Sequence, residues 1–269
     1  MNTIAFIGGG NMASAIIGGL LKSGRAPGDI LVLEPNAEQR SRLQRELQVI
    51  TLEAPGSVLQ RAGIVVWAIK PQSFKEAAAA NLPHTNTALQ FSVMAGIRSS
   101  DMAKALATQR IVRSMPNTPA LIGQGIAGLY ARDAVTADER KQIDKLMAPT
   151  GRTLWVNAEA DLDAVTALSG SGPAYVFYFV EAMVQAAAEM GLSEEQGKQL
   201  ALATFSGASA LAQASPETPA VLRERVTSKG GTTYAALTSM EASGVKPAIV
   251  KALKAAQRRA GELGDEFGR

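Results

Sequence analysis

Short apolar runs alternate with amphipathic patterns over the first part of the chain. The run 64–69 (Ile-Val-Val-Trp-Ala-Ile) is typical, because it is apolar at every position rather than at every second one. Strands of this kind are covered by helices on both faces, and their alternation with helices favours parallel pairing. The pattern predicts an α/β fold with a doubly wound, parallel, Rossmann-type sheet. The predicted strands are 3–7, 30–33, 64–69, 89–92, 110–114, 125–130 and 152–156, with a capping box at 136–139 opening the helix between the last two.

The apolar period changes to 3.6 residues after Asn157 and stays there, which predicts an all-α second domain. Ser193 with Gln196 three residues later is the signature of a helix N-terminus. We therefore expect two domains, 1–157 and 158–269. The second is expected to pack its many apolar faces against another subunit. Its predicted helices are 159–168, 173–190, 194–213, 217–226, 234–243 and 247–266.

Composition narrows the class of protein. Of the 269 residues, 46% are hydrophobic and 19% charged, and the net charge of +3 comes without a run of like charge. Nucleic acid is therefore not an indicated partner. The absence of cysteine excludes thiolate nucleophiles and disulfides and fits a reducing cytoplasm. The single histidine, His84, is expected in a surface loop at 82–85, far from any nucleophile motif, and no metal site is predicted.

No membrane segment is expected either. The first 21 residues carry no charged side chain, but they lack a basic start and are interrupted by three glycines and Asn11. The other apolar segment, 172–190, contains Glu181 and Glu189. We expect a soluble, cytoplasmic protein.

A glycine-rich turn follows the first predicted strand. Gly8, Gly10 and Ala13 form a G-x-G-x-x-A pattern between that strand and a helix beginning near Asn11. In dinucleotide-binding folds the first glycine permits the tight turn, and the second lets the backbone approach a pyrophosphate at the helix N-terminus. The position of this turn predicts a dinucleotide site. The alternative is a turn that serves only helix packing.

Glu34 ends the second predicted strand, 26 residues after Gly8. A carboxylate at this position accepts a hydrogen bond from a ribose 2′-hydroxyl and repels a 2′-phosphate, which favours NAD. Asn36, Arg40 and Arg42 follow closely and would reach a phosphate if Glu34 turned away. The arginines could equally coat a helix. The sequence leaves the choice between NADH and NADPH open.

Other residues follow later strand ends and are expected to line the same crevice. Lys70 precedes Pro71, which keeps it out of helical angles, so it is either a cofactor-edge residue or an ordinary solvated lysine. The segments 94–96 and 115–119 come after the next strands, and two prolines stiffen the chain around Asn117.

Two loops of the helical domain are rich in small residues. The first, 168–175 (Leu-Ser-Gly-Ser-Gly-Pro-Ala-Tyr), leads into a helix. The second, 227–233 (Thr-Ser-Lys-Gly-Gly-Thr-Thr), places hydroxyls and two glycines before another helix, where N–H groups and hydroxyls would form a pocket for a carboxylate. The simpler alternative is an N-cap turn with Thr232 or Thr233 as the capping residue.

Taken together, these motifs resemble the pyrroline-5-carboxylate reductase family over the whole chain. They are 6–13, 69–71, 115–119, 168–175 and 227–233, in the family's order and spacing. The resemblance implies a Rossmann domain followed by an all-α dimerisation domain, in a homodimer through the C-terminal helices that assembles into a larger homo-oligomer such as a decamer. It implies NAD(P)H-dependent reduction of 1-pyrroline-5-carboxylate, the small-molecule partner, to L-proline in the last step of proline biosynthesis.

The resemblance also implies site residues at matching positions. Thr233 is the catalytic candidate, because its hydroxyl is suited to donate a hydrogen bond to the ring nitrogen of the substrate. The substrate-binding candidates are Ser228, Gly230, Gly231, Thr232 and Thr233. The cofactor-binding candidates, to which we add Glu34 and Asn36, are Ile7, Gly8, Gly9, Gly10, Asn11, Met12, Ala68, Ile69, Lys70, Pro71, Met94, Ala95 and Gly96.

Three positions depart from the family pattern. Lys229 stands where many members have proline, an asparagine common before the strand at 64–69 is absent, and the acidic residue near Pro219 is displaced to Glu217. Two alternatives to the reductase remain. One is a β-hydroxyacid dehydrogenase-like oxidoreductase, although Lys198 lies in a plain amphipathic stretch. The other is a dinucleotide-sensing protein without turnover.

Overall fold

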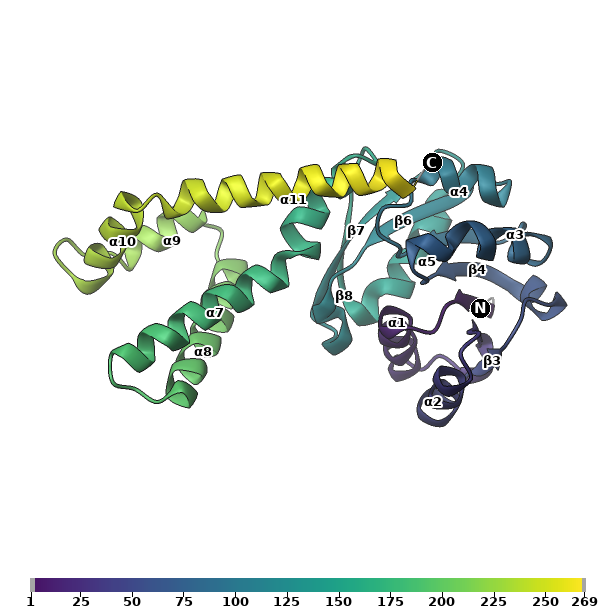
Figure 1. Ribbon diagram of the computed structural model, residues 1–269, viewed down its shortest axis with the longest axis horizontal. Helices are drawn as coiled ribbons and strands as arrows, with labels where there is room; N and C mark the ends of the chain where they lie inside the picture. The colour runs from purple at the N-terminus through teal and green to yellow at the C-terminus, as the bar shows by residue number, and fades with distance from the viewer. Residues whose placement is uncertain (1–2, 268–269) are drawn as a thin grey trace. The chain divides into compact units, whose positions relative to one another are not determined.

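The structure, a computed structural model, describes residues 3–267. The chain folds as two compact units, one formed by Met1–Ser171 with Ala256–Arg269 and the other by Gly172–Ala255. The first unit contains the sheet and the second is helical (Figure 1). The last helix, α11 (Val245–Phe267), begins in the second unit and ends in the first.

Within the described residues, eight strands form one sheet in the order β3-β2-β1-β4-β5-β6-β7-β8. Neighbouring strands are parallel except for β6 and β7, which are antiparallel. The predicted all-parallel sheet is therefore wrong for this one pair of strands. Only residues 116–124 join β6 to β7, too few for the crossover helix that a parallel pair requires. The strands are β1 (Thr3–Ile7), β2 (Ile30–Leu33), β3 (Ile50–Leu52), β4 (Ala62–Trp67), β5 (Leu89–Ser92), β6 (Ile111–Met115), β7 (Gly125–Ala131) and β8 (Gly151–Trp155).

Helices cover both faces of the sheet, as the continuously apolar strands predict. In β1, Ile4 and Phe6 belong to one buried cluster, while Ala5 and Ile7 belong to a second cluster on the opposite face. The first cluster includes side chains of α1, α2 and α5, and the second includes side chains of α3 and α4. The bounds are α1 (Asn11–Lys22), α2 (Ala37–Leu47), α3 (Phe74–Thr85), α4 (Ser99–Leu106), α5 (Ala137–Met147) and α6 (Asp161–Val165).

Three further features of the first unit differ from what the sequence predicted. The short edge strand β3 was not predicted, because its three residues are half-exposed and carry no apolar run. His84 is not in a loop: it lies in the last turn of α3, half-buried, one residue after Pro83. The predicted helix 159–168 is in fact α6 followed by a π-helical turn, Thr166–Gly170.

The second unit has little core of its own. Its helices α7 (Gly172–Glu189) and α8 (Glu194–Ala214) lie side by side, and Gly197 is close enough to Ala187 that a Cβ at 197 would lie 2.7 Å from the Ala187 Cβ. Of residues 172–255, Ala187, Gly197 and Ala201 are the ones that are buried. The remaining helices are α9 (Pro219–Arg225), α10 (Thr232–Ala242) and the first part of α11.

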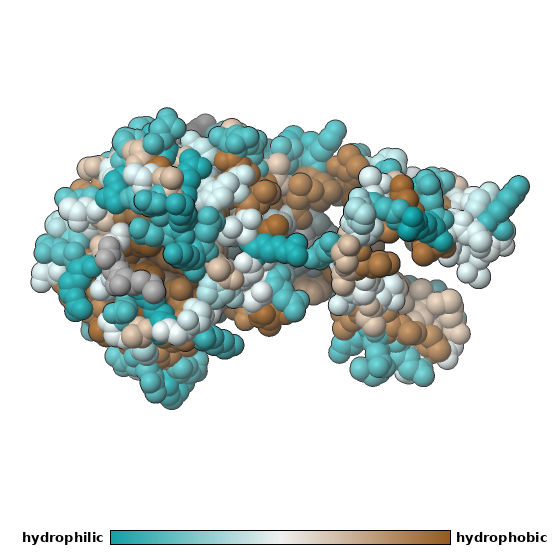
Figure 2. All heavy atoms as spheres, turned by 180° about the vertical axis from the view of Figure 1, so that it is seen from behind, coloured by the Kyte–Doolittle hydropathy of each residue, from teal (hydrophilic) through white to brown (hydrophobic). Residues whose placement is uncertain are grey.

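Large apolar side chains remain exposed on these helices, and Figure 2 shows apolar residues at their surface. Tyr178 is 71% exposed and Phe177 is 59% exposed, both on α7. Isolated exposed apolar residues are ordinary, but a helical unit that leaves most of its apolar side chains in water needs another surface to cover them. Within residues 3–267 there is no helix that is both long enough and apolar enough to span a membrane.

Candidate active site

The carboxyl ends of four parallel strands meet at one edge of the sheet. Ile7, at the end of β1, pairs with Leu33 at the end of β2 and with Trp67 at the end of β4. Trp67 pairs in turn with Ser92 at the end of β5. Ligands of open α/β sheets bind outside such strand ends. The structure gathers the predicted cofactor residues along this edge, at 7–12, 34, 36, 68–71 and 94–96.

The turn after β1 requires glycine at its first position and leaves little room for a side chain at its second. Gly8 has a φ of +97°, and a Cβ there would lie 2.6 Å from the backbone oxygen of Ala68. A Cβ on Gly9 would lie 2.5 Å from Cδ1 of Leu43. Gly10 is different, because its φ of −69° suits any residue and no atom lies within 4 Å of the place of its Cβ. The backbone of this turn therefore borders open space at Gly10.

Helix α1 begins directly at that open space. Its N-cap residue is Gly10, and no side chain caps the helix. Side chains cap α2 (Asn36), α5 (Thr136) and α8 (Ser193), whereas α3, α4 and α6 lack a capping side chain as α1 does. The first N–H groups of a helix need partners, and a phosphate group is a suitable one because the helix dipole also favours negative charge. The uncapped end of α1 thus has the geometry and the chemistry to bind the diphosphate of a dinucleotide.

Glu34 follows β2, and its carboxylate faces the same turn. Its Oε2 accepts a hydrogen bond from the Gly9 N–H at 2.9 Å, and its Oε1 accepts one from the Asn36 N–H at 3.0 Å. The Gln39 side chain donates to the Gly9 carbonyl oxygen. The carboxylate is therefore held beside the predicted diphosphate site, where the adenine ribose of a dinucleotide is bound in this fold.

Short loops follow the two remaining strand ends. Lys70 is extended and exposed, and Pro71 begins a 3₁₀ turn directly after it. In the loop after β5, Met94 is buried and its N–H donates to the Ser92 hydroxyl at 3.2 Å, while Ala95 is exposed. Ala95 is thus the exposed residue of the 94–96 loop.

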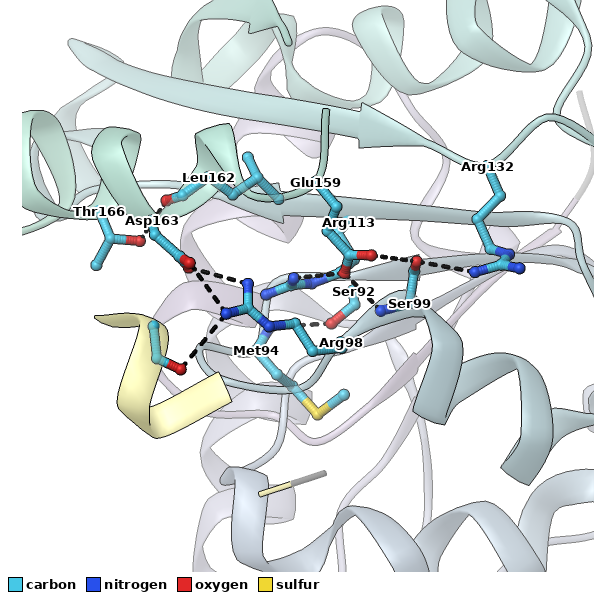
Figure 3. A network of polar contacts seen from close by, with 11 residues as sticks. Ser92, Met94, Arg98, Ser99, Arg113, Arg132, Glu159, Leu162, Asp163 and Thr166 are labelled. Atoms are coloured by element: carbon cyan, nitrogen blue, oxygen red, sulfur yellow. Dashed lines mark hydrogen bonds and ion pairs between the residues drawn. The ribbon is translucent and has the colours of Figure 1, made fainter. Parts of the chain in front are cut away.

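An ion-pair network lies immediately after the 94–96 loop (Figure 3). Arg113, in the middle of β6, is 5% exposed and donates to Oε1 of Glu159 at 2.6 Å. The backbone N–H and the hydroxyl of Ser99 each donate to Glu159 at 2.6 Å. Burial alone would raise the pKa of Glu159, but the bonds from Ser99 and the charge of Arg113 outweigh it and lower this pKa. Glu159 is thus held as a carboxylate.

Sequence reasoning missed this network. Its partners are far apart in the sequence, since Ser99 and Glu159 are 60 positions apart. One signal was present, because Arg113 is a charged residue within a predicted buried strand, and such a residue needs a partner. The sequence could not identify that partner.

The loop after β6 is joined to the π-helical turn. The Asn117 side chain accepts from the Ile126 N–H at 3.0 Å and donates to the Ser169 carbonyl oxygen at 3.2 Å. A Cβ on Gly170 would lie 2.6 Å from Cε of Met115. The motif 168–175 therefore begins in close contact with the end of β6, and π-helical turns of this kind often occur at functional sites.

The predicted substrate loop lies in the second unit, before α10. Gly230 has a φ of +75°, and the Gly231 N–H donates to the Ser228 carbonyl oxygen at 3.0 Å. The N-cap of α10 is Gly231 and no side chain caps the helix, so neither Thr232 nor Thr233 has the capping role that was the simpler alternative. Like α1, α10 begins at a glycine with its first N–H groups free of a capping side chain. Lys229 is exposed in the same turn.

Residues 3–267 contain no group of three or more His, Asp or Glu side chains arranged to hold a metal ion.

Two family models match the chain. The model described as pyrroline-5-carboxylate reductase dimerisation matches residues 159–263. A model described as NADP oxidoreductase coenzyme F420-dependent matches residues 3–96, the part that contains the predicted cofactor residues. Homo-oligomerisation follows from the first match.

Characterised relatives agree over nearly the whole length. The chain is 42% identical to a pyrroline-5-carboxylate reductase of Pseudomonas aeruginosa over 267 residues, covering 98% of both chains. It is 41% identical to the enzyme of Haemophilus influenzae, covering 97% of both. Neither a β-hydroxyacid dehydrogenase nor a sensor without turnover is favoured by these matches.

Solved structures give the same result. A pyrroline-5-carboxylate reductase of Coxiella burnetii superposes with a TM-score of 0.91 at 34% identity, covering 97% of this chain and 98% of that one. A pyrroline carboxylate reductase of Plasmodium falciparum, solved with NADP bound, has a TM-score of 0.87 at 26% identity and covers 98% of both chains. The chain belongs to the pyrroline-5-carboxylate reductase family and is an NAD(P)H-dependent oxidoreductase.

Proposed function

We propose that this chain reduces 1-pyrroline-5-carboxylate to L-proline, with the coenzyme at the edge formed by β2, β1, β4 and β5 and the substrate carboxylate at α10. The observation that carries the proposal is the pair of helices, α1 and α10, that each begin at a glycine without a capping side chain. Both reaction partners are anions, and each helix N-terminus suits one of them.

The coenzyme would be held by backbone and by one carboxylate. The N–H groups at the start of α1 would bind its diphosphate, and Glu34 would accept from its adenine ribose. The loops 68–71 and 94–96 would border its nicotinamide half. Bound NAD(P)H would supply a hydride from nicotinamide C4 to the imine carbon; a C–H bond would form there, and the electron pair of the broken C=N π bond would move to the ring nitrogen.

The substrate loop would bind and orient the imine. Ser228, Thr232 and the N–H groups of 230–233 would bind its carboxylate, and Thr233, half-buried in the first turn of α10, would donate a hydrogen bond to the ring nitrogen as it becomes an amine. A protonated imine is already electrophilic, so the protein needs only to position the two carbons. This explains how the reaction proceeds in a chain with no cysteine and a single histidine in α3.

The proposal also covers the oligomeric state, the domain boundaries and the cellular compartment of the protein. The exposed apolar side chains of α7 and α8 support a homodimer through the C-terminal helices. We extend this to a larger homo-oligomer such as a decamer, with 1–157 as the dinucleotide-binding domain and 158–269 as the dimerisation and substrate-binding domain. The family match that begins at residue 159 supports this division. The absence of cysteine supports the cytoplasm as the location.

The direct test adds synthetic 1-pyrroline-5-carboxylate to the protein and the reduced coenzyme. Coenzyme oxidation is monitored by absorbance, and L-proline is identified as the product. We expect one proline for each NAD(P)H consumed and no oxidation without the imine. Coenzyme binding without proline formation would instead support a sensor.

A further inference from the structure

We propose that Glu34 makes this chain prefer NADH to NADPH. The inference rests on the proposed function, because it concerns the coenzyme of that same site. It goes beyond the proposed reaction by assigning the residue that determines coenzyme specificity. The comparisons leave this preference open, and the sequence alone leaves Glu34, Arg40 and Arg42 as competing determinants.

The Glu34 carboxylate is held in place from two sides. Its two oxygens accept from the Gly9 N–H at 2.9 Å and the Asn36 N–H at 3.0 Å. If the Glu34 side chain turned away to admit a phosphate, both N–H groups would lose this hydrogen-bond partner. A carboxylate has about four lone-pair positions, so two remain for hydroxyl donors such as the ribose 2′-OH. The site therefore accepts a ribose hydroxyl without rearrangement.

The nearest cation is directed to other groups. Nη1 of Arg40 donates to the Glu34 carbonyl oxygen at 2.9 Å and to the Pro35 carbonyl oxygen at 2.7 Å. Its Nη2 pairs with Glu53 at 3.2 Å, and the side chain is only 17% exposed. Arg40 thus stabilises the loop that carries Glu34, and binding a phosphate would require it to give up these contacts.

Two other polar side chains of α2 and of the residue before it also have partners. The Asn36 side chain accepts from the Gln39 N–H at 2.8 Å and so caps α2. Arg42 pairs with Glu46, one turn further along the helix, at 3.6 Å. A 2′-phosphate would therefore meet the Glu34 carboxylate, while the Arg40 guanidinium in the same loop is held by Glu53 and two carbonyl oxygens.

The test measures binding of adenosine fragments as well as of whole coenzymes. Equilibrium titration compares 5′-AMP with adenosine 2′,5′-bisphosphate, and NADH with NADPH, on the full chain. We expect 5′-AMP and NADH to bind at least about tenfold more tightly than their 2′-phosphorylated counterparts. Equal or tighter binding of the 2′-phosphorylated ligands overturns the proposal. The wild-type fragment comparison decides this even where a variant fails to fold.

The variant Glu34→Gln keeps the shape of the side chain and removes its charge. We expect it to shift the ratio of NADPH to NADH affinity towards NADPH by about tenfold or more. Glu38→Gln is the matched control, because it removes the same charge from an exposed position in the first turn of α2. It is expected to leave the ratio within about twofold. If Glu38→Gln shifted the affinity ratio as much, or if Glu34→Gln did not shift it, Glu34 would not determine the coenzyme preference.

The fragment assay separates this inference from the proposed function. Selective binding of 5′-AMP without reduction of the imine would leave the Glu34 assignment standing and refute the reaction. Reduction of the imine with equal binding and use of both coenzymes would support the reaction and refute the Glu34 assignment.

Discussion

Arg98 and Asp163 are joined by two parallel hydrogen bonds, of 3.0 Å from Nη1 and 2.9 Å from Nη2, although 65 residues separate them in the sequence. Arg98 follows the 94–96 loop and precedes α4, and Asp163 lies in α6. The same guanidinium donates to the Gly261 carbonyl oxygen of α11 at 3.4 Å. One side chain therefore connects a predicted cofactor loop to two later helices of the first unit.

Breaking this pair is expected to destabilise the first unit. The two side chains are 21% and 18% exposed, so Asp163→Asn leaves a partly buried arginine with a weaker partner. We expect the free energy of unfolding to fall by about 1–3 kcal/mol, measured by urea denaturation. Asp138→Asn is the control, because its pair with Lys141 is 84% and 72% exposed and should contribute about 0–1 kcal/mol. Equal losses in both variants would contradict the structural role of Arg98.

Acid is expected to weaken the fold through Glu159. Its pKa is lowered in the folded state below the ordinary value of 4.5, because the bonds from Ser99 and the charge of Arg113 outweigh the opposing effect of burial. The unfolded chain therefore binds a proton more readily than the folded one. This contribution to stability is complete above the unfolded value and is lost as the pH falls through the lowered folded value.

The corresponding measurement is the melting temperature between about pH 3 and pH 7 in wild type and Glu159→Gln. The variant should melt lower at neutral pH, and its melting temperature should fall less on acidification. Glu46→Gln, on an exposed position of α2, serves as the control and should keep the wild-type slope. Parallel acid profiles for wild type and Glu159→Gln would remove Glu159 from the explanation.

Substitution of Gly10 is expected to separate coenzyme binding from folding. Its φ of −69° and the open space around its Cβ position mean that Gly10→Ala should fold normally. The added methyl group would occupy the space where a diphosphate approaches, so the dissociation constant for NADH should rise about tenfold or more. Gly18→Ala, in the same helix and also in open space, should bind normally and gain about 0.5–1 kcal/mol in stability. Normal coenzyme binding by Gly10→Ala would place the diphosphate elsewhere.

Removal of the Thr233 hydroxyl is expected to slow turnover. Thr233→Ala should lower kcat/KM for the imine by about tenfold or more, the effect of one hydrogen bond, without changing coenzyme affinity. Thr233→Ser keeps the hydroxyl and should recover most of the activity. Thr238→Ala is the control on the same helix, because the Thr238 hydroxyl already donates to the Tyr234 carbonyl oxygen at 2.8 Å. Wild-type kinetics in Thr233→Ala would exclude this residue from the site.

A charge on the exposed face of α7 is expected to break the assembly. Tyr178 is 71% exposed in the single chain, and Tyr178→Glu would place a carboxylate in the interface that we propose covers it. Light scattering should show a smaller particle than wild type. Lys198→Glu, on an exposed polar position of α8, should leave the mass unchanged. An unchanged mass in Tyr178→Glu would show that this side chain is not covered by another subunit.

Much of the fold follows from local sequence alone. The run 64–69 predicted a buried strand, and β4 occupies 62–67 of the sheet centre. Both predicted capping boxes are present, at Thr136 and at Ser193. These features depend on hydrogen bonds and burial within a few residues, so neighbouring side chains are sufficient to specify them.

Sequence also identified which residues gather at the sheet edge, because parallel strands with their carboxyl ends together leave little freedom in where the following loops lie. It could not determine what those residues do there. Whether Glu34 faces the glycine turn, and whether Arg40 is available to a phosphate, depends on contacts with Gly9 and Glu53, which are distant in the sequence.

The tertiary structure alone decided the remaining features. The antiparallel pairing of β6 with β7 and the partner of Arg113 both depend on segments that meet only in the folded chain. Periodicity and turn chemistry encode short-range preferences, whereas these pairings are set by the packing of distant segments and by the need of buried charges for a partner. The sequence by itself therefore determined the elements and the glycine turns of this protein, and the folded chain determined which charges face each other.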